Sequence, residues 1–236
     1  MADKPNRRKF LATTGAGVGM ISLAPGLFQD DEDMPQVRPP KNAKLLFDGK
    51  DLSQWVSTKG GAAGWKVKDG HMEVVGGSGD IYTREVFTDF QLHIEFWLPL
   101  MASAQGQARA NSGVYMQGRY ELQVLDSYGL QSQDNDCGGI YKIAPPLTNA
   151  CKKPERWQAY DIAFRHVRFN ALGRLREKAR VTILHNGVMI HNNLELPGPT
   201  AGGLDADINK PGPLLLQDHG NPVRYRNIWI AALNAS

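Results

Sequence analysis

Short runs of alternating apolar and polar residues, separated by Gly, Pro, Asn and Asp, make up the chain from about residue 45 onward. Alternation with a period of two is typical of β-strands, because successive side chains point to opposite faces of a sheet. Asn186-Gly187 predicts a two-residue hairpin turn, and Asp69-Gly70 predicts a second. The expected strands cover residues 65–68, 71–75, 90–98, 112–117, 120–126, 158–164, 180–185, 188–195, 213–217 and 223–231.

No segment of the chain has a sustained helical period. Ten or more antiparallel strands without helices must bury their apolar faces against one another, which predicts an all-β sandwich of two sheets. The chain has 236 residues, with 25 Gly and 14 Pro. One domain over residues 44–236 is the natural expectation, since all-β folds of this size commonly remain undivided.

The first residues of the chain have the layout of an export signal. Arg7 and Arg8 stand directly before Phe10 and Leu11, and a weakly apolar run rich in Gly, Ala and Thr follows. This order predicts a twin-arginine signal over residues 1–28. Residues 29–43 are acidic and rich in proline, which favours a disordered linker. We therefore expect a periplasmic or secreted protein.

The formal net charge is +3, from 27 basic and 24 acidic side chains that are interspersed along the chain. Nucleic-acid binding would need clustered Lys and Arg on one face, so no such partner is expected. No stretch reaches the ~20 continuous apolar residues that span a bilayer, so we expect no stable membrane insertion once the signal is removed.

Cys137 and Cys151 are the two cysteines of the chain, and both follow the expected signal. In an oxidising compartment they are expected to pair and close the Gly- and Pro-rich segment between them. Two free thiols are the alternative. Two cysteines without suitably spaced histidines do not predict a structural zinc site.

The side chains that alternation excludes from the core are unusually rich in Glu, Gln, Asn, His, Arg, Trp and Tyr. Amides and carboxylates suit sugar hydroxyls, and aromatic faces suit sugar C–H surfaces, so these residues predict carbohydrate recognition. An ordinary solvated sheet face is the alternative. The main members are Glu95, Asn111, Tyr115, Glu121, Gln123, Gln217, His219 and Arg226.

A series of motifs carries a more specific resemblance. They are, in order, LFDGKDLSQW at 46–55, NSGVY at 111–115, YELQVLD at 120–126, GIY at 139–141, WQAY at 157–160, HNGV at 185–188, LQDHG at 216–220 and RNI at 226–228. In this order the chain resembles the 3-keto-disaccharide hydrolase family, also described as 3-keto-glucoside lyase/hydratase domains. The resemblance covers residues 44–233 and implies a concanavalin-like jelly-roll sandwich. Residues 105–110, just before NSGVY, form a loop that is able to reshape the site.

The resemblance implies cleavage of 3-keto-glycosides. A ketone at C3 of the sugar acidifies the C2 proton, so a base removes that proton and the aglycone leaves from C1 by β-elimination. Addition of water would complete a net hydrolysis. The expected roles are base and acid for His219 and Glu121, and enolate stabiliser for Arg226. The expected sugar ligands are Glu95, Asn111, Tyr115, Gln123, Tyr141 and Gln217.

Other interpretations stay open at this point. A divalent cation bound by Glu95, Glu121 and His219 is an alternative to Arg226 as the enolate stabiliser. Glu95 and Glu121 are also a possible carboxylate pair of a glycosidase that acts on unoxidised sugar. A non-catalytic carbohydrate-binding module is the interpretation outside enzymology.

Overall fold

The computed structural model describes residues 37–233 of the chain. The expected twin-arginine signal and the first part of the expected linker lie outside these residues. The first strand, β1 (Lys44–Phe47), begins close to the start of the expected domain. Within residues 37–233, no helix is long and apolar enough to cross a membrane.

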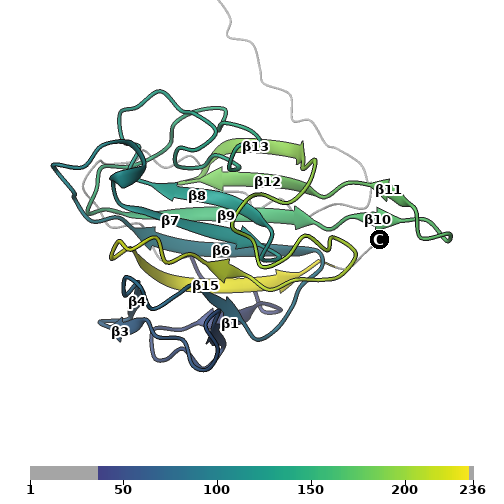
Figure 1. The fold of residues 1–236 in the computed structure, drawn as a ribbon, viewed down its shortest axis with the longest axis horizontal. Helices are drawn as coiled ribbons and strands as arrows, with labels where there is room; N and C mark the ends of the chain where they lie inside the picture. The colour runs from purple at the N-terminus through teal and green to yellow at the C-terminus, as the bar shows by residue number, and fades with distance from the viewer. Residues whose placement is uncertain (1–36, 234–236) are drawn as a thin grey trace, which may run out of the picture. The chain divides into compact units, whose positions relative to one another are not determined.

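The larger of the two main sheets has eight strands, all paired antiparallel (Figure 1). Its order is β13-β12-β9-β6-β15-β4-β3, and β1 pairs with β15. We call it the large sheet. Its other strands are β3 (Lys66–Lys68), β4 (His71–Glu73), β6 (Phe90–Trp97), β9 (Trp157–Arg165), β12 (Arg180–His185), β13 (Val188–Glu195) and β15 (Arg224–Ala232).

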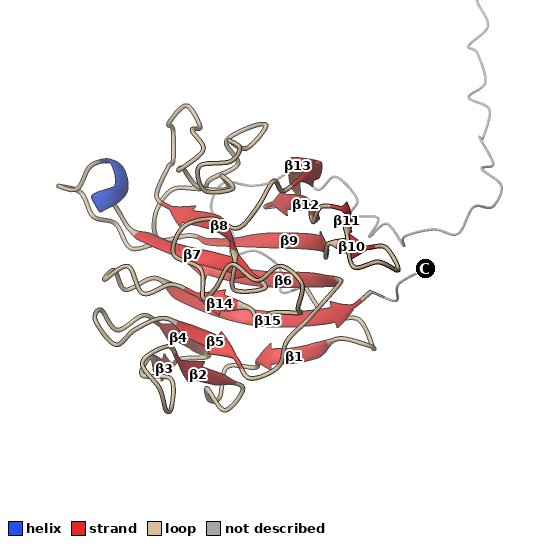
Figure 2. Ribbon diagram, turned by 45° about the vertical axis from the view of Figure 1, so that its right-hand side comes forward, coloured by secondary structure: helices blue, strands red, loops and turns tan. Residues whose placement is uncertain are grey.

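The second sheet, which we call the small sheet, has five strands in the order β2-β5-β14-β7-β8. These are β2 (Trp55–Ser57), β5 (Ile81–Thr83), β14 (Leu215–Leu216), β7 (Asn111–Met116) and β8 (Tyr120–Leu125). A separate hairpin joins β10 (Arg168–Phe169) to β11 (Leu175–Glu177). Figure 2 shows one short helical element beside the strands, the 3-10 turn η1 (Gly106–Ala108).

Both expected hairpin turns are confirmed by backbone angles in the left-handed region. Asn186 and Gly187 have φ of 52° and 79°, and they join β12 to β13. Asp69 and Gly70 have φ of 49° and 77°, and they join β3 to β4. Two consecutive positive φ values define the turn type that matches the twist of paired strands, and Asn, Asp and Gly adopt them most readily. Strands β1, β2, β5, β10 and β11 were not predicted. Each has at most four residues, and unlike β3 and β4 none is joined to its partner by a two-residue Asp-Gly or Asn-Gly turn.

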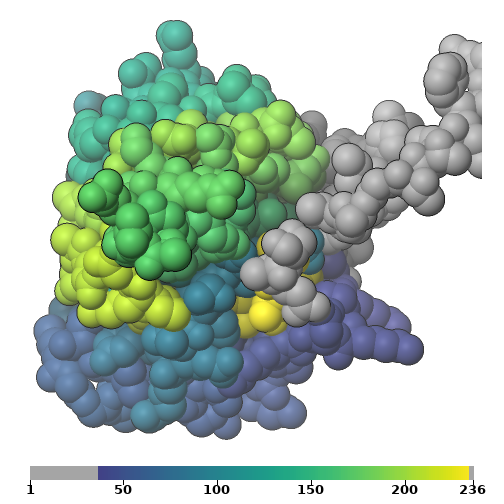
Figure 3. All heavy atoms as spheres, turned by 90° about the vertical axis from the view of Figure 1, so that its right-hand side faces the viewer, coloured from purple at the N-terminus to yellow at the C-terminus, as the bar shows by residue number. Residues whose placement is uncertain are grey.

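The core lies between the two sheets and confirms the expected sandwich. Leu92, Ile94 and Phe96 enter it from β6 of the large sheet, and Leu122 and Val124 enter it from β8 of the small sheet. Each sheet therefore has an inner apolar face and an outer face that carries the alternate residues. In Figure 3, side chains from the middle of the chain, in green, cover one end of the sandwich, with early segments in blue and purple below them.

The expected disulfide is absent, because Cys137 and Cys151 are buried free thiols in the structure. The Sγ atom of Cys137 lies 3.2 Å from the hydroxyl of Tyr160, and the Sγ atom of Cys151 lies 3.4 Å from the carbonyl of Lys152. Both thiols belong to the hydrophobic core, where a reduced cysteine packs as a small apolar side chain.

Candidate functional site

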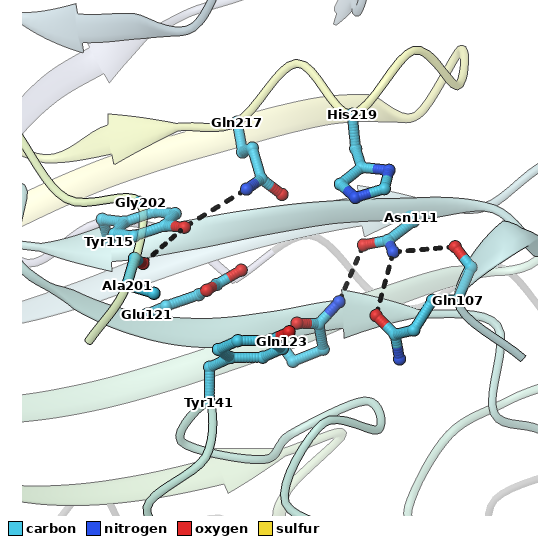
Figure 4. Close-up of a pocket in the computed structure, with 10 residues that line it drawn as sticks. All are labelled: Gln107, Asn111, Tyr115, Glu121, Gln123, Tyr141, Ala201, Gly202, Gln217 and His219. Carbon is cyan, nitrogen blue, oxygen red and sulfur yellow. Dashed lines mark hydrogen bonds between the residues drawn. The ribbon is translucent and has the colours of Figure 1, made fainter.

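A cavity of about 200 Å³ opens on the outer face of the small sheet. Its lining combines one carboxyl group, one imidazole, two phenol rings and four amide side chains (Figure 4). Among these ten described residues there is no Lys or Arg. They are Gln107, Asn111, Tyr115, Glu121, Gln123, Tyr141, Ala201, Gly202, Gln217 and His219.

The floor of the cavity comes from β7 and β8. Tyr115 pairs with Glu121 across these strands, and Gly113 pairs with Gln123. Paired residues of antiparallel strands share a face, and Leu122 and Val124 occupy the opposite, inner face. The period-two pattern thus places Glu121 and Gln123 beside Tyr115 on the outer face, as the sequence predicted.

Tyr141 reaches the cavity because its segment runs along β8 as an additional strand-like edge. The amide of Tyr141 donates to the carbonyl of Glu121 over 3.1 Å. The amide of Gly138 donates to the carbonyl of Gln123 over 3.0 Å, and the amide of Gln123 donates to the carbonyl of Gly139 over 2.9 Å. These hydrogen bonds fix Tyr141 next to the outer face of β8.

Residues 197–212 form a loop that covers the Tyr115 end of the cavity. Arg119 is buried and holds this loop through Asp205, with 2.7 Å between Nε and the carboxylate. The hydroxyl of Tyr115 donates to the carbonyl of Ala201 over 3.3 Å. Gly202 has a φ of +78°, and a Cβ there would lie 2.6 Å from the Tyr115 hydroxyl. Only glycine fits this approach without strain.

The opposite end of the cavity is closed by η1. The side chain of Gln107 donates to the carbonyl of Asn135 over 2.7 Å, which holds the turn in place. Asn111 in turn donates to the carbonyl of Gln107 over 3.0 Å and to its side-chain oxygen over 3.2 Å. The loop at residues 105–110 therefore contributes to the site, although Gln107 itself was not predicted as a site residue.

Glu121 is the carboxyl group at the centre of the cavity, and only 4% of it is exposed. Burial raises the pKa of Glu121 to about 7, and the negative charge of Asp80 acts in the same direction. The hydrogen bond with Tyr115 acts in the opposite direction, but its effect is smaller than that of burial. A Cβ on Gly113 would lie 2.7 Å from the Oε1 atom of Glu121, so the missing side chain provides the space for this carboxyl group. Glu121 can therefore accept or donate a proton near neutral pH.

Two amide oxygens at the cavity are buried without a hydrogen-bond partner. They are the Oε1 atoms of Gln123 and Gln217. The amide nitrogen of Gln123 donates to Asn111 over 2.7 Å, and that of Gln217 donates to the Tyr115 hydroxyl over 3.2 Å. Figure 4 shows the Gln217 oxygen directed away from Tyr115. Buried acceptors without partners are uncommon and costly, so these two oxygens suit the hydroxyl groups of a ligand.

His219 stands at the exposed rim of the cavity, on the turn that follows β14. The amide of Asp218 donates to the Oδ1 atom of Asp80 over 2.8 Å, and the Asp218 carboxylate accepts from the amide of Gly79 over 2.8 Å. The side chain of Asn221 accepts from the amide of Asn111 over 3.0 Å. This turn is thus held on both sides, as expected for a strand end with a rigid base.

Glu95 and Arg226 do not belong to this cavity, and the expectation that they share a site with Glu121 and His219 is wrong. They pair across β6 and β15 of the large sheet. Their neighbours Phe96 and Tyr225 point into the core, so both side chains lie on the outer face of the large sheet. The core of the sandwich separates that face from the cavity.

On that outer face, Glu95 is the centre of a closed network of hydrogen bonds. It accepts from Arg226 over 2.5 Å and from Asn227 over 2.8 Å, and it lies 3.5 Å from the Nε2 atom of His93. The Nδ1 atom of His93 lies 2.7 Å from Asp161. We call these five residues, His93, Glu95, Asp161, Arg226 and Asn227, the large-sheet network.

Electrostatics in the large-sheet network favours charged side chains. Burial alone would lower the pKa of His93, but the hydrogen bonds and charges of Asp161 and Glu95 outweigh it and raise the pKa to about 9. Burial would raise the pKa of Glu95, but His93, Asn227 and Arg226 together lower it. The network therefore holds an ionised carboxylate and a protonated imidazole at neutral pH.

This separation removes two arrangements that the sequence left open. Glu95 cannot join Glu121 and His219 around one cation, because it lies on the other sheet. Within residues 37–233, no group of three or more His, Cys, Asp or Glu side chains has the geometry to hold a metal ion. Glu95 and Glu121 likewise cannot flank one glycosidic bond as a carboxylate pair.

Asp80 is a charged residue near the cavity that sequence reasoning missed. Burial raises its pKa, and its charge acts on Glu121 and Tyr115. It lies in a Gly-rich stretch just before β5, where alternation gives no indication of the direction of a side chain. The pattern of strand faces therefore contains no signal that would have identified it.

The fold and the cavity together define the class of protein. It is an all-β sandwich whose small sheet has a polar, partly aromatic pocket of the kind that binds small polar ligands. The chain belongs to the family of the 3-keto-alpha-glucoside-1,2-lyase-like domain, whose model matches residues 42–231. The resemblance inferred from the motifs is thereby confirmed.

Solved structures from Parabacteroides distasonis ATCC 8503 that are described as candidate glycosyl hydrolases are similar to this chain. One is 44% identical, with a TM-score of 0.75, and the match covers 82% of this chain and 85% of that one. A second is 24% identical, with a TM-score of 0.63, over 82% of this chain and 95% of that one. The second supports the fold alone. No curated protein matches the chain.

Proposed function

We propose that the protein cleaves 3-keto-glycosides by removing the C2 proton and eliminating the aglycone from C1, with later addition of water. The observation that carries this proposal is the buried Glu121 carboxyl, with a pKa of about 7, beside two unpaired amide oxygens. A carboxyl tuned to neutral pH in a polar cavity is typical of an acid–base catalyst. Membership of a 3-keto-glucoside lyase-like family supports the choice of substrate.

Glu121 is the better base of the two candidates in this cavity. Its side chain is buried at the floor, whereas His219 is exposed at the rim. A buried carboxylate with a raised pKa is a stronger base than an ordinary one and is still largely ionised above pH 7. The C2 proton passes to Glu121, and its electron pair forms an enolate with the C3 ketone.

Elimination then needs a proton for the leaving oxygen. His219 at the open rim is in the position to supply it, because the aglycone must extend toward solvent when the sugar ring fills the cavity. The C1–C2 double bond forms as the C1–O bond breaks, and the alcohol leaves with the proton of His219. Water entering from the same side completes a hydrolysis when it adds across the double bond.

The remaining lining residues have roles in binding. Gln123 and Gln217 accept from sugar hydroxyls through their unpaired oxygens. With Arg226 on the other sheet, the hydroxyl of Tyr115 takes over as the donor to the enolate oxygen, exchanging its 3.3 Å hydrogen bond to the Ala201 carbonyl for one to the substrate. Burial raises the pKa of Tyr115 and keeps the hydroxyl protonated. Asn111 fixes the orientation of the Gln123 amide through a 2.7 Å hydrogen bond.

Carbohydrate binding without turnover is the second candidate function. The unpaired oxygens of Gln123 and Gln217 favour it as much as they favour catalysis, since both need a bound sugar. The raised pKa of Glu121 separates the two, because a binding module has no need for a carboxyl that titrates near neutral pH.

The test is incubation of the purified protein with a 3-keto-glucoside and with its unoxidised parent, each with and without a chelator. We expect the aglycone and an unsaturated 3-keto sugar to appear from the oxidised substrate alone. The Glu121→Gln variant serves as the matched control for contaminating activity. Binding of the keto-glucoside without release of aglycone would support the binding module, and release from the unoxidised parent would contradict elimination. Loss of activity with chelator would add a divalent cation to the mechanism.

A further inference from the structure

The turn that carries His219 is fixed by a reciprocal contact with the residues before β5. The Oδ1 atom of Asp80 accepts from the amide of Asp218 over 2.8 Å, and the Oδ2 atom of Asp218 accepts from the amide of Gly79 over 2.8 Å. The Oδ1 atom of Asp218 also accepts from the amide of Gly220 over 3.0 Å. His219 therefore lies between Asp218 and Gly220, whose backbone amides both donate hydrogen bonds to carboxylates.

Strand register explains why Asp80 is beside this turn. Ile81, the first residue of β5, pairs with Leu216, the last residue of β14. In an antiparallel pair, the residue before one strand lies next to the residue after the other. Asp80 consequently stands beside Gln217 and Asp218, and a Cβ on Gly76 would lie 2.9 Å from the carbonyl oxygen of Gly220. The two segments are closely packed.

The charged and titratable neighbours of Asp80 come from several elements. Asp218 and His219 lie on the turn, and Lys59 follows β2. Its charge also acts on Glu121 of β8 and on Tyr115 of β7.

We propose that Asp80 is a positioning residue of this site, whose carboxylate fixes the His219 turn and adds a second negative charge to the surroundings of Glu121. This inference rests on the proposed function, because it assigns Asp80 to the same acid–base machinery. Hydrogen bonding to the Asp218 amide directs the imidazole of His219 toward the cavity. The like charge disfavours ionisation of Glu121 and keeps that carboxyl basic.

The test compares Asp80→Asn with Asp69→Asn. The side-chain amide introduced by Asp80→Asn keeps an acceptor for the Asp218 amide and removes the charge, so the variant should fold. Asp69 is an exposed residue of the β3–β4 turn, and its substitution removes one charge far from the cavity. Asp80→Ala, which also removes the acceptor, is the third variant.

Two readouts are measured on each variant. The first is the titration of the Glu121 carboxyl by NMR, which needs no substrate. We expect its midpoint to fall in Asp80→Asn and Asp80→Ala and to stay at the wild-type value in Asp69→Asn. The second is the pH profile of kcat/KM with a 3-keto-glucoside, whose acidic limb should move to lower pH in Asp80→Asn. We expect Asp80→Ala to lose about ten- to hundredfold in kcat through misplacement of His219.

The outcomes separate the two proposals. An unchanged Glu121 midpoint in Asp80→Asn would overturn the role of Asp80, whether or not the enzyme is active. A lowered midpoint in the variant, together with a wild-type protein that releases no aglycone, would support the electrostatic role and contradict the proposed function. If Asp80→Ala does not fold, the midpoint of the Glu121 titration in Asp80→Asn alone decides whether Asp80 has the proposed role.

Discussion

The large-sheet network and the cavity on the small sheet contain the same kinds of side chain but differ in how completely these are paired. On the large sheet, both oxygens of Glu95 have hydrogen-bond partners, and both ring nitrogens of His93 face a carboxylate. On the small sheet, the side-chain oxygens of Gln123 and Gln217 have none. Both sets are largely buried, so the contrast does not come from exposure to water.

The contrast distinguishes structural polar groups from functional ones. A buried ionic network is stable only when every member is satisfied, and the large-sheet network meets that condition. Aromatic contacts reinforce it, since the Arg226 guanidinium lies 4.0 Å from the Trp157 ring centroid and the rings of His93 and Trp229 stack at 5.4 Å. The cavity leaves acceptors unpaired, which lowers stability unless a ligand supplies the donors.

The largest expected effect is on turnover. Glu121→Gln should reduce cleavage of a 3-keto-glycoside by about 10²–10⁴-fold, because the amide cannot accept the C2 proton. The folded protein should not lose stability. Burial raises the pKa of Glu121 from 4.5 to about 7, so the wild type loses stability as the pH rises toward and through 7, and the variant does not.

Rate measurements and urea denaturation at pH 8 test this prediction. The urea midpoint of Glu121→Gln should equal or exceed that of the wild type. Wild-type turnover in the variant would remove Glu121 from the chemistry, and a strong loss of stability would assign it to the same structural category as Glu95.

The next largest effect is the loss of stability in Glu95→Gln, which is the counterpart of Glu121→Gln on the other face. Removing the Glu95 charge from this buried network leaves Arg226 without its carboxylate and His93 with Asp161 alone, and should cost about 3 kcal/mol. Turnover per folded molecule should stay at the wild-type level, because Glu95 lies across the core from the cavity. A specific loss of turnover at unchanged stability would reverse the comparison.

The smallest effect in this series is the stability that the protein loses at alkaline pH, when His93 loses its proton. Its pKa is about 9 in the folded protein and ordinarily 6.5, so its stabilisation is full below pH 6.5 and is lost as the pH rises through 9. The difference amounts to roughly 3 kcal/mol at most, and relaxation of the network should reduce it. Unfolding free energies measured from pH 5 to 10 should fall more steeply in the wild type than in His93→Gln. Equal slopes would indicate that His93 is not protonated in the folded state.

Much of the site follows from alternation and the family motifs. Glu121 and Gln123 alternate with Leu122 and Val124, so their position on an outer face was predictable from the strand period alone. The same reasoning placed Asn111 and Tyr115 together. Gln217 and His219 were predictable because they follow an apolar segment that must be a buried strand.

The residues that the sequence could not assign are those held by contacts between distant segments. Gln107 reaches the cavity through Asn135, and Gly202 reaches it through the Arg119–Asp205 pair. Asp80 reaches it through the pairing of Ile81 with Leu216. Each contact joins residues far apart in the chain, and no local pattern encodes it.

The sequence by itself determined that the chain is all-β, where two of its hairpin turns lie, and which residues of each long strand avoid the core. Only the tertiary structure decided that Glu95 and Glu121 belong to different faces. Alternation sorts the side chains within a strand, but it does not say which sheet the strand joins. The strands β6 and β8 have the same pattern, and their separation into two sheets with the core between them depends on long-range pairing.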